Sequence, residues 1–413
     1  MRVYSEASLR AITEGRQSAA CGVFGIQNPG GASPEVGAMS IEALAGYDQR
    51  GGSIVDKYGQ ATADGAGMTV RTDNDECGRG LQPYLHRKVG RAVPLTRDDE
   101  QLHSGLIFVD HEQGGNVSDV ARVFRHELNA RGFQYLNWDK ALVNPGAVSP
   151  RSRLMMPEVY QLVYAEGELT PLQMREAIFR VRLAVQERLK ETGVSIVSLQ
   201  PGTLTFKGMC LGSELPDLYP DINAPDFITD AAIGHIRYST NVLARWILAQ
   251  LFDLIGHNGE ITSIEVMIEM LKFLEQFYDL PSSNVMPGGS DSANLDRIIQ
   301  MLHAQGLSLE EALRFIFHPA PDDLKRMPSE VQAYFKAVSR IFGGLKAVGP
   351  AAVIGMDRDS MVAQLDGQGL RQLGWTRRRD GLIVIGSELG IPHIPHDKID
   401  TFGRLEAGQQ VIV

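Results

Sequence analysis

Short strand-like runs alternate with longer amphipathic segments from residue 21 to the carboxyl end, and this alternation constrains the fold more than any other feature. The runs that predict strands are 21–26, 68–71, 103–110, 158–164, 194–199, 203–207, 350–356, 382–386 and 410–413. The segments that predict helices are 35–47, 117–131, 170–191, 263–279, 294–305, 308–317 and 328–342. Because long helical segments separate several strands, and no repeat or flexible linker divides them, we expect one large α+β domain.

Composition excludes several classes of protein. The formal net charge of −10 argues against a nucleic acid or an anionic membrane as the main partner, although a local arginine could still bind a small anionic or zwitterionic ligand. Three scattered cysteines (Cys21, Cys77 and Cys210) form neither a disulfide framework nor a CxxC pair for zinc or iron–sulfur ligation. No apolar run is long enough to span a bilayer. We therefore expect a soluble protein of the reducing cytoplasm, with no metal site.

Cys21 stands at the head of the first predicted strand and is followed by Gly22, so a substrate carbonyl could approach its thiol. Cleavage after Ala20 would give this residue a free α-amine, whose unperturbed pKa of about 7.7–8.0 suits a proton carrier. Residues 1–20 lack the continuous apolar core of a secretory signal, which leaves a pro-segment or an N-terminal extension. The alternative is that Cys21 is a small apolar residue in a core strand.

Two polar clusters, at 234–241 and 255–261, add groups that a thiol hydrolase of an amino-acid amide would need. The side-chain amide of Asn258 and the backbone N–H of the glycine after it could bind a developing oxyanion, although Asn-Gly is also typical of a type I′ turn. Arg237 could hold a carboxylate, or be a solvated or paired arginine. Asp291 could hold an ammonium group, or cap the following helix. Together these groups describe glutamine as the substrate.

Ten segments support a more specific identification. They are CGVFGI (21–26), QRG (49–51), ADGAGM (63–68), SLQPGTLTFKGM (198–209), GHIRYSTN (234–241), ARW (244–246), HNGEIT (257–262), GGSDSANLD (288–296), GPAAVI (349–354) and SELG (387–390). In their order and spacing they resemble the class II glutamine amidotransferase domain at the N-terminus of the glutamate synthase large subunit, an N-terminal-nucleophile hydrolase. The resemblance runs from Cys21 almost to Val413.

The resemblance implies a four-layer αββα sandwich, in which two antiparallel sheets pack face to face between helices. It makes residues 1–20 a pro-segment or extension and 21–413 the amidotransferase domain, with 319–345 as a possible helical connector to the C-terminal part. The residues it assigns to the site are Cys21 as nucleophile, Asn258 and Gly259 as oxyanion hole, Arg237 for the glutamine α-carboxylate, Asp291 for the α-ammonium, and Arg50, Gly51 and His257 as further substrate-binding residues.

The sequence departs from the family pattern at four places. Gln49 replaces the usual histidine of His-Arg-Gly, and Ala63 replaces the first glycine of Thr-Gly-Asp-Gly-Ala-Gly. A helix-like segment at 263–279 replaces an arginine- and asparagine-rich stretch, and 365–372 differs from the usual Leu-Asp-Arg-Asn-Gly-Leu-Arg-Pro. None of these changes removes a primary catalytic group. They bear on the contacts that would couple this domain to a synthase partner.

The resemblance also implies what this chain works with. A full synthase carries an FMN-binding barrel and an iron–sulfur cluster, and neither is expected here. We therefore expect no cofactor on this chain, and a separate ammonia-accepting synthase subunit that carries FMN and the cluster. Two alternatives remain: a non-catalytic glutamine-binding regulatory subunit that keeps its pro-segment, and a hydrolase of a different amide whose entrance is reshaped by 263–279.

Overall fold

The computed structural model describes ten parts of the chain, and all structural statements below concern them. They are residues 21–50, 53–55, 61–63, 65–73, 80–90, 101–110, 114, 116–236, 245–280 and 284–413, with the backbone alone for residues 50, 53–55 and 61–63. The expected pro-segment, 1–20, lies outside these ranges.

The strands and helices alternate along the chain as the sequence predicts. The strands are β1 (Gly22–Gln27), β2 (Ser53–Val55), β3 (Ala61–Ala63), β4 (Ala66–Arg71), β5 (Leu102–Val109), β6 (Gln134–Lys140), β7 (Glu158–Ala165), β8 (Val194–Ser198), β9 (Thr203–Gly208), β10 (Ala231–Ile236), β11 (Ile255–Gly259), β12 (Ala351–Met356), β13 (Met361–Leu365), β14 (Gly374–Arg378), β15 (Ile383–Gly386), β16 (Ile399–Arg404) and β17 (Gln410–Ile412). The α-helices are α2 (Pro34–Tyr47), α3 (Gln82–Val89), α4 (Val117–Asn129), α5 (Pro150–Leu154), α6 (Pro171–Arg188), α7 (Leu215–Leu218), α8 (Ile264–Phe277), α9 (Asp291–Ala304), α10 (Leu309–Ile316), α11 (Pro321–Leu324) and α12 (Ser329–Phe342).

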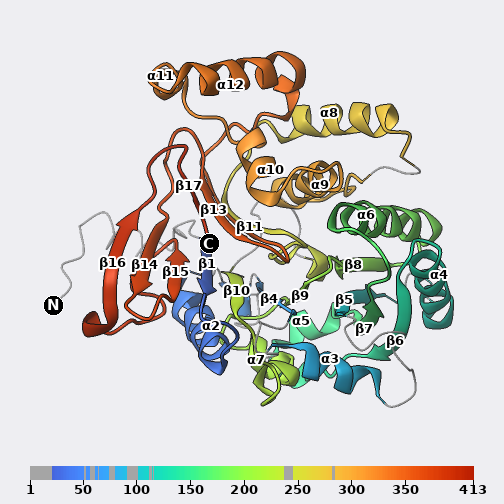
Figure 1. The fold of residues 1–413 in the computed structure, drawn as a ribbon. Helices are drawn as coiled ribbons and strands as arrows, with labels where there is room; N and C mark the ends of the chain where they lie inside the picture. Colours follow the sequence, from blue (N-terminus) through green and yellow to red (C-terminus); the bar gives the residue numbers. More distant parts are fainter. Residues whose placement is uncertain are drawn as a thin grey trace.

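Two antiparallel sheets pack face to face at the centre of the molecule (Figure 1). The larger sheet has the order β16-β14-β15-β1-β10-β4-β9, and the second sheet has the order β11-β12-β13-β17. β1 and β10 lie against β11 and β12. The side chains between the sheets are apolar and buried, among them Val23, Ile233, Ile354 and Ile385. This inner core fixes where the first strand lies relative to β11.

Helices cover the outer faces of both sheets. α2 packs on β1 and β10 through Val36, Leu44 and Tyr47, while α9 and α10 cover the second sheet and α8 packs on α9 (Figure 1). α2 begins at the favourable N-cap Ser33, whose hydroxyl accepts a hydrogen bond from the backbone N–H of Glu35. The order of layers is therefore helix, sheet, sheet, helix, and the expected αββα sandwich is confirmed.

A third antiparallel sheet, β6-β7-β5-β8, was not expected as a separate unit. It packs against α4 and α6 around its own core, which includes Ile107, Phe124 and Val181. Ser198 joins this sheet to the edge of the larger one, because its hydroxyl accepts hydrogen bonds from Leu106 N and Thr205 N, each at 3.3 Å. The third sheet extends the sandwich beyond its four layers.

Most predicted elements are confirmed with end shifts of a few residues, but several strands were missed. β14 and β16 lie at an edge of the larger sheet, where charged and exposed residues interrupt the apolar alternation that identifies a strand. β6, at an edge of the third sheet, was missed for the same reason. The helix expected at 294–305 begins three residues earlier, at Asp291.

α11 and α12 occupy most of 319–345, the possible connector, and run between α10 and β12. The connector role itself stays a prediction. Within the described chain, no helix combines the length and the apolar character needed to cross a membrane.

Candidate active site

Cys21 lies directly before β1, half-buried, at one end of the larger sheet. The next residue must be glycine, because a Cβ on Gly22 would overlap the ring of Tyr47. That ring stacks on Phe24 and its hydroxyl accepts a hydrogen bond from Glu388 N at 3.0 Å, so it cannot easily move. Cys21 is therefore not the fully buried core residue of the alternative interpretation.

The second described cysteine is more deeply buried than Cys21. Cys210 is 1% exposed and lies within the core that backs the larger sheet. Burial raises the pKa of its thiol, which disfavours the nucleophilic thiolate. Of these two thiols, Cys21 is the one placed for chemistry.

Asn258 lies beside Cys21 although 237 positions separate them. It belongs to β11, and its Nδ2 donates to the carbonyl oxygen of Cys21 at 3.0 Å and to Ser387 Oγ at 3.3 Å. The side chain is buried, so these hydrogen bonds are largely shielded from water. The face-to-face packing of the two sheets thus brings the predicted nucleophile and the predicted oxyanion donor together.

Ser387 is a site residue to which the sequence analysis assigned no role. Its hydroxyl accepts a hydrogen bond from Val23 N at 3.2 Å, and its own N–H donates to the Val23 carbonyl at 2.9 Å. It therefore fixes the end of β15 to the start of β1 and also contacts Asn258. The SELG segment at 387–390 was the only sequence signal that pointed to it.

Gly259 follows Asn258 at the end of β11, opposite Ala351 of β12. Its φ is +156°, and a Cβ there would overlap the carbonyl oxygen of Pro350. Both residues of the Asn-Gly pair are strand residues in register with β12, so the type I′ turn alternative is wrong.

His257 is buried behind this pair. Its backbone is held at both ends by the side-chain amide of Gln250: His257 N donates to Gln250 Oε1 at 2.8 Å, and Gln250 Nε2 donates to the His257 carbonyl at 3.1 Å. Its Nδ1 lies 2.8 Å from Ser292 Oγ, and burial lowers the pKa of the imidazole. The structure thus gives His257 and Gln250 contacts that support β11. The predicted contact of His257 with substrate stays a prediction.

Asp291 joins the start of α9 to the chain that leaves β11. Its Oδ2 accepts a hydrogen bond from Ile261 N at 2.9 Å, and its Oδ1 accepts one from Ser292 N at 2.7 Å. The helix cap is Ser290, whose hydroxyl accepts from Ala293 N, so the N-cap alternative for Asp291 is wrong. A carboxylate in the first helical turn is also favoured by the helix dipole. Its predicted role as the ammonium site is not tested by these contacts.

The structure gives no contacts with substrate-binding groups for three of the predicted substrate-binding residues. Arg237 and Gly51 lie outside the described residues, and Arg50 is described by its backbone alone, at the end of a 3₁₀ turn. β10 ends at Ile236, which pairs with Gly22, so the described chain stops beside Cys21 at the residue before Arg237. Within the described parts of the chain, no group of three or more His, Cys, Asp or Glu residues is arranged to hold a metal ion.

A half-buried cysteine at the start of a central strand, whose carbonyl accepts a hydrogen bond from an asparagine of the opposed sheet of a four-layer sandwich, fits an N-terminal-nucleophile hydrolase fold. The chain belongs to the class II glutamine amidotransferases: a family model described as "Glutamine amidotransferases class-II" matches residues 21–413. This membership confirms the resemblance and identifies the protein as an amidotransferase.

Curated relatives are glutamate synthases. The large chain of the NADPH-dependent glutamate synthase of Azospirillum brasilense is 27% identical over 408 residues, which cover 95% of this chain and 26% of that protein. The ferredoxin-dependent enzyme of Antithamnion sp. is 25% identical over 415 residues, which cover 95% of this chain and 26% of that protein. A ferredoxin-dependent enzyme of Arabidopsis thaliana is 28% identical over 418 residues, which cover 95% of this chain and 24% of that protein. The chain thus spans about a quarter of the length of these relatives.

The solved structures that are similar to this chain include two enzymes. One is described as the allosteric regulatory enzyme of purine biosynthesis and shows a TM-score of 0.41 at 14% identity, covering 95% of this chain and 46% of that one. The other is the glutamine phosphoribosylpyrophosphate amidotransferase of B. subtilis complexed with ADP and GMP, with a TM-score of 0.32 at 20% identity, covering 51% and 38%.

Proposed function

We propose that this protein hydrolyses L-glutamine to L-glutamate and ammonia, with Cys21 as an N-terminal nucleophile, and delivers the ammonia to a separate synthase subunit. The observation that carries the proposal is the hydrogen bond from Asn258 Nδ2 to the Cys21 carbonyl, which supports a role for this amide as the oxyanion donor. The family membership and the glutamate synthase relatives support glutamine as the substrate.

The chemistry requires removal of residues 1–20, so that the α-amine of Cys21 can act as the base. The amine takes the thiol proton, and the thiolate sulfur attacks the side-chain amide carbon of glutamine. Asn258 Nδ2 and the N–H of Gly259 would stabilise the tetrahedral oxyanion. The C–N bond then breaks, the Cys21 ammonium returns its proton to the departing nitrogen, and ammonia leaves a γ-glutamyl thioester. Water attacks this thioester and releases glutamate and the free thiol.

The remaining groups of the site would hold the rest of the substrate. We assign the glutamine α-carboxylate to Arg237 and its α-ammonium to Asp291, with Arg50, Gly51 and His257 shaping the pocket. Asp291 already lies one hydrogen bond from the chain that follows Gly259, so an ammonium bound to it would be close to the oxyanion strand. Because Arg237 would bind the carboxylate and Asp291 the ammonium group, the two residues together would select an unmodified α-amino acid.

The ammonia acceptor is a proposal that rests on the relatives. They are glutamate synthases, and this chain matches about a quarter of each. We propose that the acceptor is a separate subunit that carries FMN and an iron–sulfur cluster. Affinity capture of the native protein, analysed for a flavin- and iron-containing subunit, tests this part independently of glutamine hydrolysis.

The test of the nucleophile combines mass spectrometry with an affinity label. The purified protein should lack residues 1–20, and 6-diazo-5-oxo-L-norleucine should attach to Cys21. Cys21→Ala should abolish both labelling and ammonia release, whereas Cys210→Ala should retain both. Asn258→Ala should still form the N-terminal cysteine but lower kcat by about 10²–10³-fold, the effect of losing one oxyanion donor. An intact N-terminus with no labelling and no ammonia release, even with partner subunits present, would contradict the proposal and favour a glutamine-binding regulatory subunit.

A further inference from the structure

A cavity of about 300 Å³ lies at the end of the sandwich opposite to Cys21. Two elements connect the two places. α9 begins at Asp291, in the candidate active site, and its last turn carries His303 into the cavity wall; β12 begins opposite Gly259 and leads into Asp357. A helix of 14 residues is about 21 Å long, so the cavity is a place distinct from the candidate active site.

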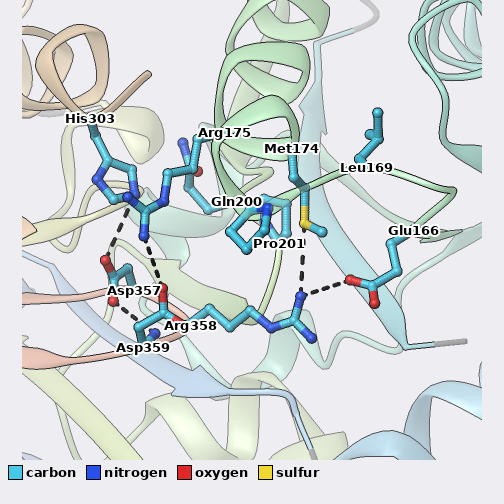
Figure 2. A pocket seen from close by; sticks show the side chains of 11 residues that line it. Glu166, Leu169, Met174, Arg175, Gln200, Pro201, His303, Asp357, Arg358 and Asp359 are labelled. Atoms are coloured by element: carbon cyan, nitrogen blue, oxygen red, sulfur yellow. Dashed lines mark hydrogen bonds and ion pairs between the residues drawn. The ribbon is translucent and has the colours of Figure 1, made fainter. Parts of the chain in front are cut away.

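One wall of the cavity presents two hydrogen-bond acceptors that face each other. His303 and Asp357 are 4% and 5% exposed. His303 Nδ1 lies 3.0 Å from the carbonyl oxygen of Leu307, which can only accept, so Nδ1 carries the hydrogen. Burial lowers the pKa of this imidazole, which leaves Nε2 as a lone-pair acceptor near neutral pH. Nε2 is 3.7 Å from Asp357 Oδ2, too far for a direct hydrogen bond (Figure 2).

A ligand ammonium group fits this pair of acceptors. An ammonium has three donors and no acceptor, and two of them could bind His303 Nε2 and Asp357 Oδ2 together. The other carboxylate oxygen of Asp357 is already occupied, because it accepts hydrogen bonds from the N–H groups of Asp359 and Ser360 at 2.9 and 2.7 Å. The turn between β12 and β13 thus holds the Asp357 carboxylate in place while Oδ2 faces the histidine.

The same cavity presents guanidinium groups that could hold a carboxylate. Arg175 pairs with Asp359 at 2.9 Å through Nη2. Arg358 reaches Asp73 through Nε at 2.5 Å and Glu166 through Nη1 at 2.7 Å. A guanidinium has five N–H donors, so each arginine keeps donors beyond these ion pairs. Arg175 also acts electrostatically on the imidazole of His303, which places a carboxylate-binding group close to the ammonium-binding pair (Figure 2).

Gln200 gives the cavity a polar side chain with both a donor and an acceptor. It is 6% exposed, and its backbone N–H donates to Asp253 Oδ1, but its side-chain amide has no hydrogen-bond partner among the described residues. Neither amide atom is among the buried side-chain atoms that lack a partner, so the amide is open to the cavity, where a bound ligand or water can be its partner. Leu169 and Met174 supply apolar surface in the same wall. Polar groups of both signs beside apolar surface are typical of a small-molecule site.

We propose that this cavity binds a small α-amino acid. Its ammonium group lies between His303 and Asp357, its carboxylate binds the unused donors of Arg175, and its side chain contacts Gln200. The volume is at the lower end of the range for small-molecule sites, about 300–1,000 Å³, which suits a ligand of this size.

The experiment is calorimetric titration of the full chain with L-glutamate and with two four-carbon fragments. Butylamine carries only the ammonium group, and butyrate carries only a carboxylate. The amino acid should bind at least tenfold more tightly than either fragment, because only it meets both charged walls. Asp357→Asn keeps the turn-forming oxygen and should weaken this binding at least tenfold. Gln200→Leu, of similar size, should weaken it severalfold. Asp291→Asn alters the candidate active site and should leave this binding unchanged.

Three results would overturn the proposal. One is a loss of binding in Asp291→Asn with none in Asp357→Asn, which would place the amino acid in the candidate active site. Another is binding of one fragment as tight as that of glutamate, and the third is no saturable binding at about 10 mM. Melting curves without ligand show that each variant is folded, and Gln200→Leu keeps the proposal testable if Asp357→Asn does not fold.

Discussion

Gly259 shows how a single residue connects the fold to the proposed chemistry. A Cβ at this position would overlap the carbonyl oxygen of Pro350, which is backbone and cannot rotate away. Gly259→Ala should therefore lower the free energy of unfolding by about 3 kcal/mol, the upper end of the range for overpacking. It should also reduce ammonia release, because the strand that carries Asn258 must shift. Chemical denaturation and a glutaminase assay measure the two effects.

Gly343 offers the matched control. It follows α12, and nothing lies within 4 Å of a Cβ built there. Gly343→Ala should change the free energy of unfolding by less than about 0.5 kcal/mol, as expected for a surface substitution that removes no contact. Equal stabilities for the two alanine variants would show that the close approach of Pro350 does not constrain Gly259.

Lys207 should make stability depend on pH in the alkaline range. It is fully buried in β9, where Nζ donates to the carbonyls of Ile247 and Leu251 at 2.7 and 3.1 Å. Burial lowers its pKa to about 7, against an ordinary value near 10.5. Between these two pH values the unfolded chain binds more protons than the folded one, so the free energy of unfolding rises with pH. The slope from this group is at most about 1.4 kcal/mol per pH unit.

Substitution isolates this contribution from those of other groups. Lys207→Met should remove the alkaline rise, so the stability difference between wild type and variant should grow from pH 7 to pH 9 in denaturant titrations. Lys272→Met is the control, because that lysine is exposed and pairs with Glu269 on the surface of α8. A wild-type-minus-variant difference that stays constant over this range would show that Lys207 does not titrate there.

At the scale of elements, one buried ion pair joins three parts of the fold. Arg182 of α6 pairs with Asp253, which precedes β11, and both side chains are buried. Asp253 Oδ1 also accepts hydrogen bonds from Leu199 N at 3.0 Å and Gln200 N at 3.4 Å, just after β8. The pair therefore fixes α6, the end of β8 and the approach to β11 relative to one another.

Asp253→Ala should lower the free energy of unfolding by about 3–5 kcal/mol, because it leaves the guanidinium buried without its partner. The double variant Arg182→Met/Asp253→Ala removes both charges and should recover part of this loss. Denaturant titration of wild type and the three variants, Arg182→Met included, gives the coupling energy directly. A double variant less stable than the sum of its two single variants predicts would contradict this account.

The sequence predicted individual helices and strands better than it predicted which strands pair and which residues form hydrogen bonds between them. β1, α2 and α9 follow from local apolar patterns, whereas the segment of β11 was identified only as a polar cluster. The motif resemblance identified the sandwich and paired Cys21 with Asn258. Local pattern could not show that β5 to β8 form a separate sheet, because pairing between distant strands is a tertiary property. For the same reason the roles of Ser387 and Gln250 were missed: each depends on hydrogen bonds to another strand that no local spacing encodes.

At the scale of the whole molecule, the two facing sheets determine the geometry of the site. Cys21 directly precedes β1 of the larger sheet and Asn258 belongs to the second sheet, so their contact depends on the apolar layer between the sheets. Ile354 of β12 lies in this layer, in register with Gly256 of β11. A methyl of Ile354 would also be in contact with a Cβ on Gly25 of β1, which shows how closely the two sheets approach. A substitution that removes side-chain volume from this layer should therefore change the position of Asn258 relative to Cys21.

Ile354→Ala and Ile107→Ala separate this effect from general destabilisation. Both isoleucines are fully buried strand residues, but Ile107 lies in the core of the third sheet. Each substitution should cost about 2–5 kcal/mol of unfolding free energy through lost burial and a residual cavity. Assayed well below both melting temperatures, Ile354→Ala should also lower kcat severalfold, because the sheets can settle towards each other and shift Asn258 relative to Cys21. Ile107→Ala should retain wild-type kcat. If both variants lost activity equally, the position of Asn258 would depend on overall stability and not on the layer between the sheets.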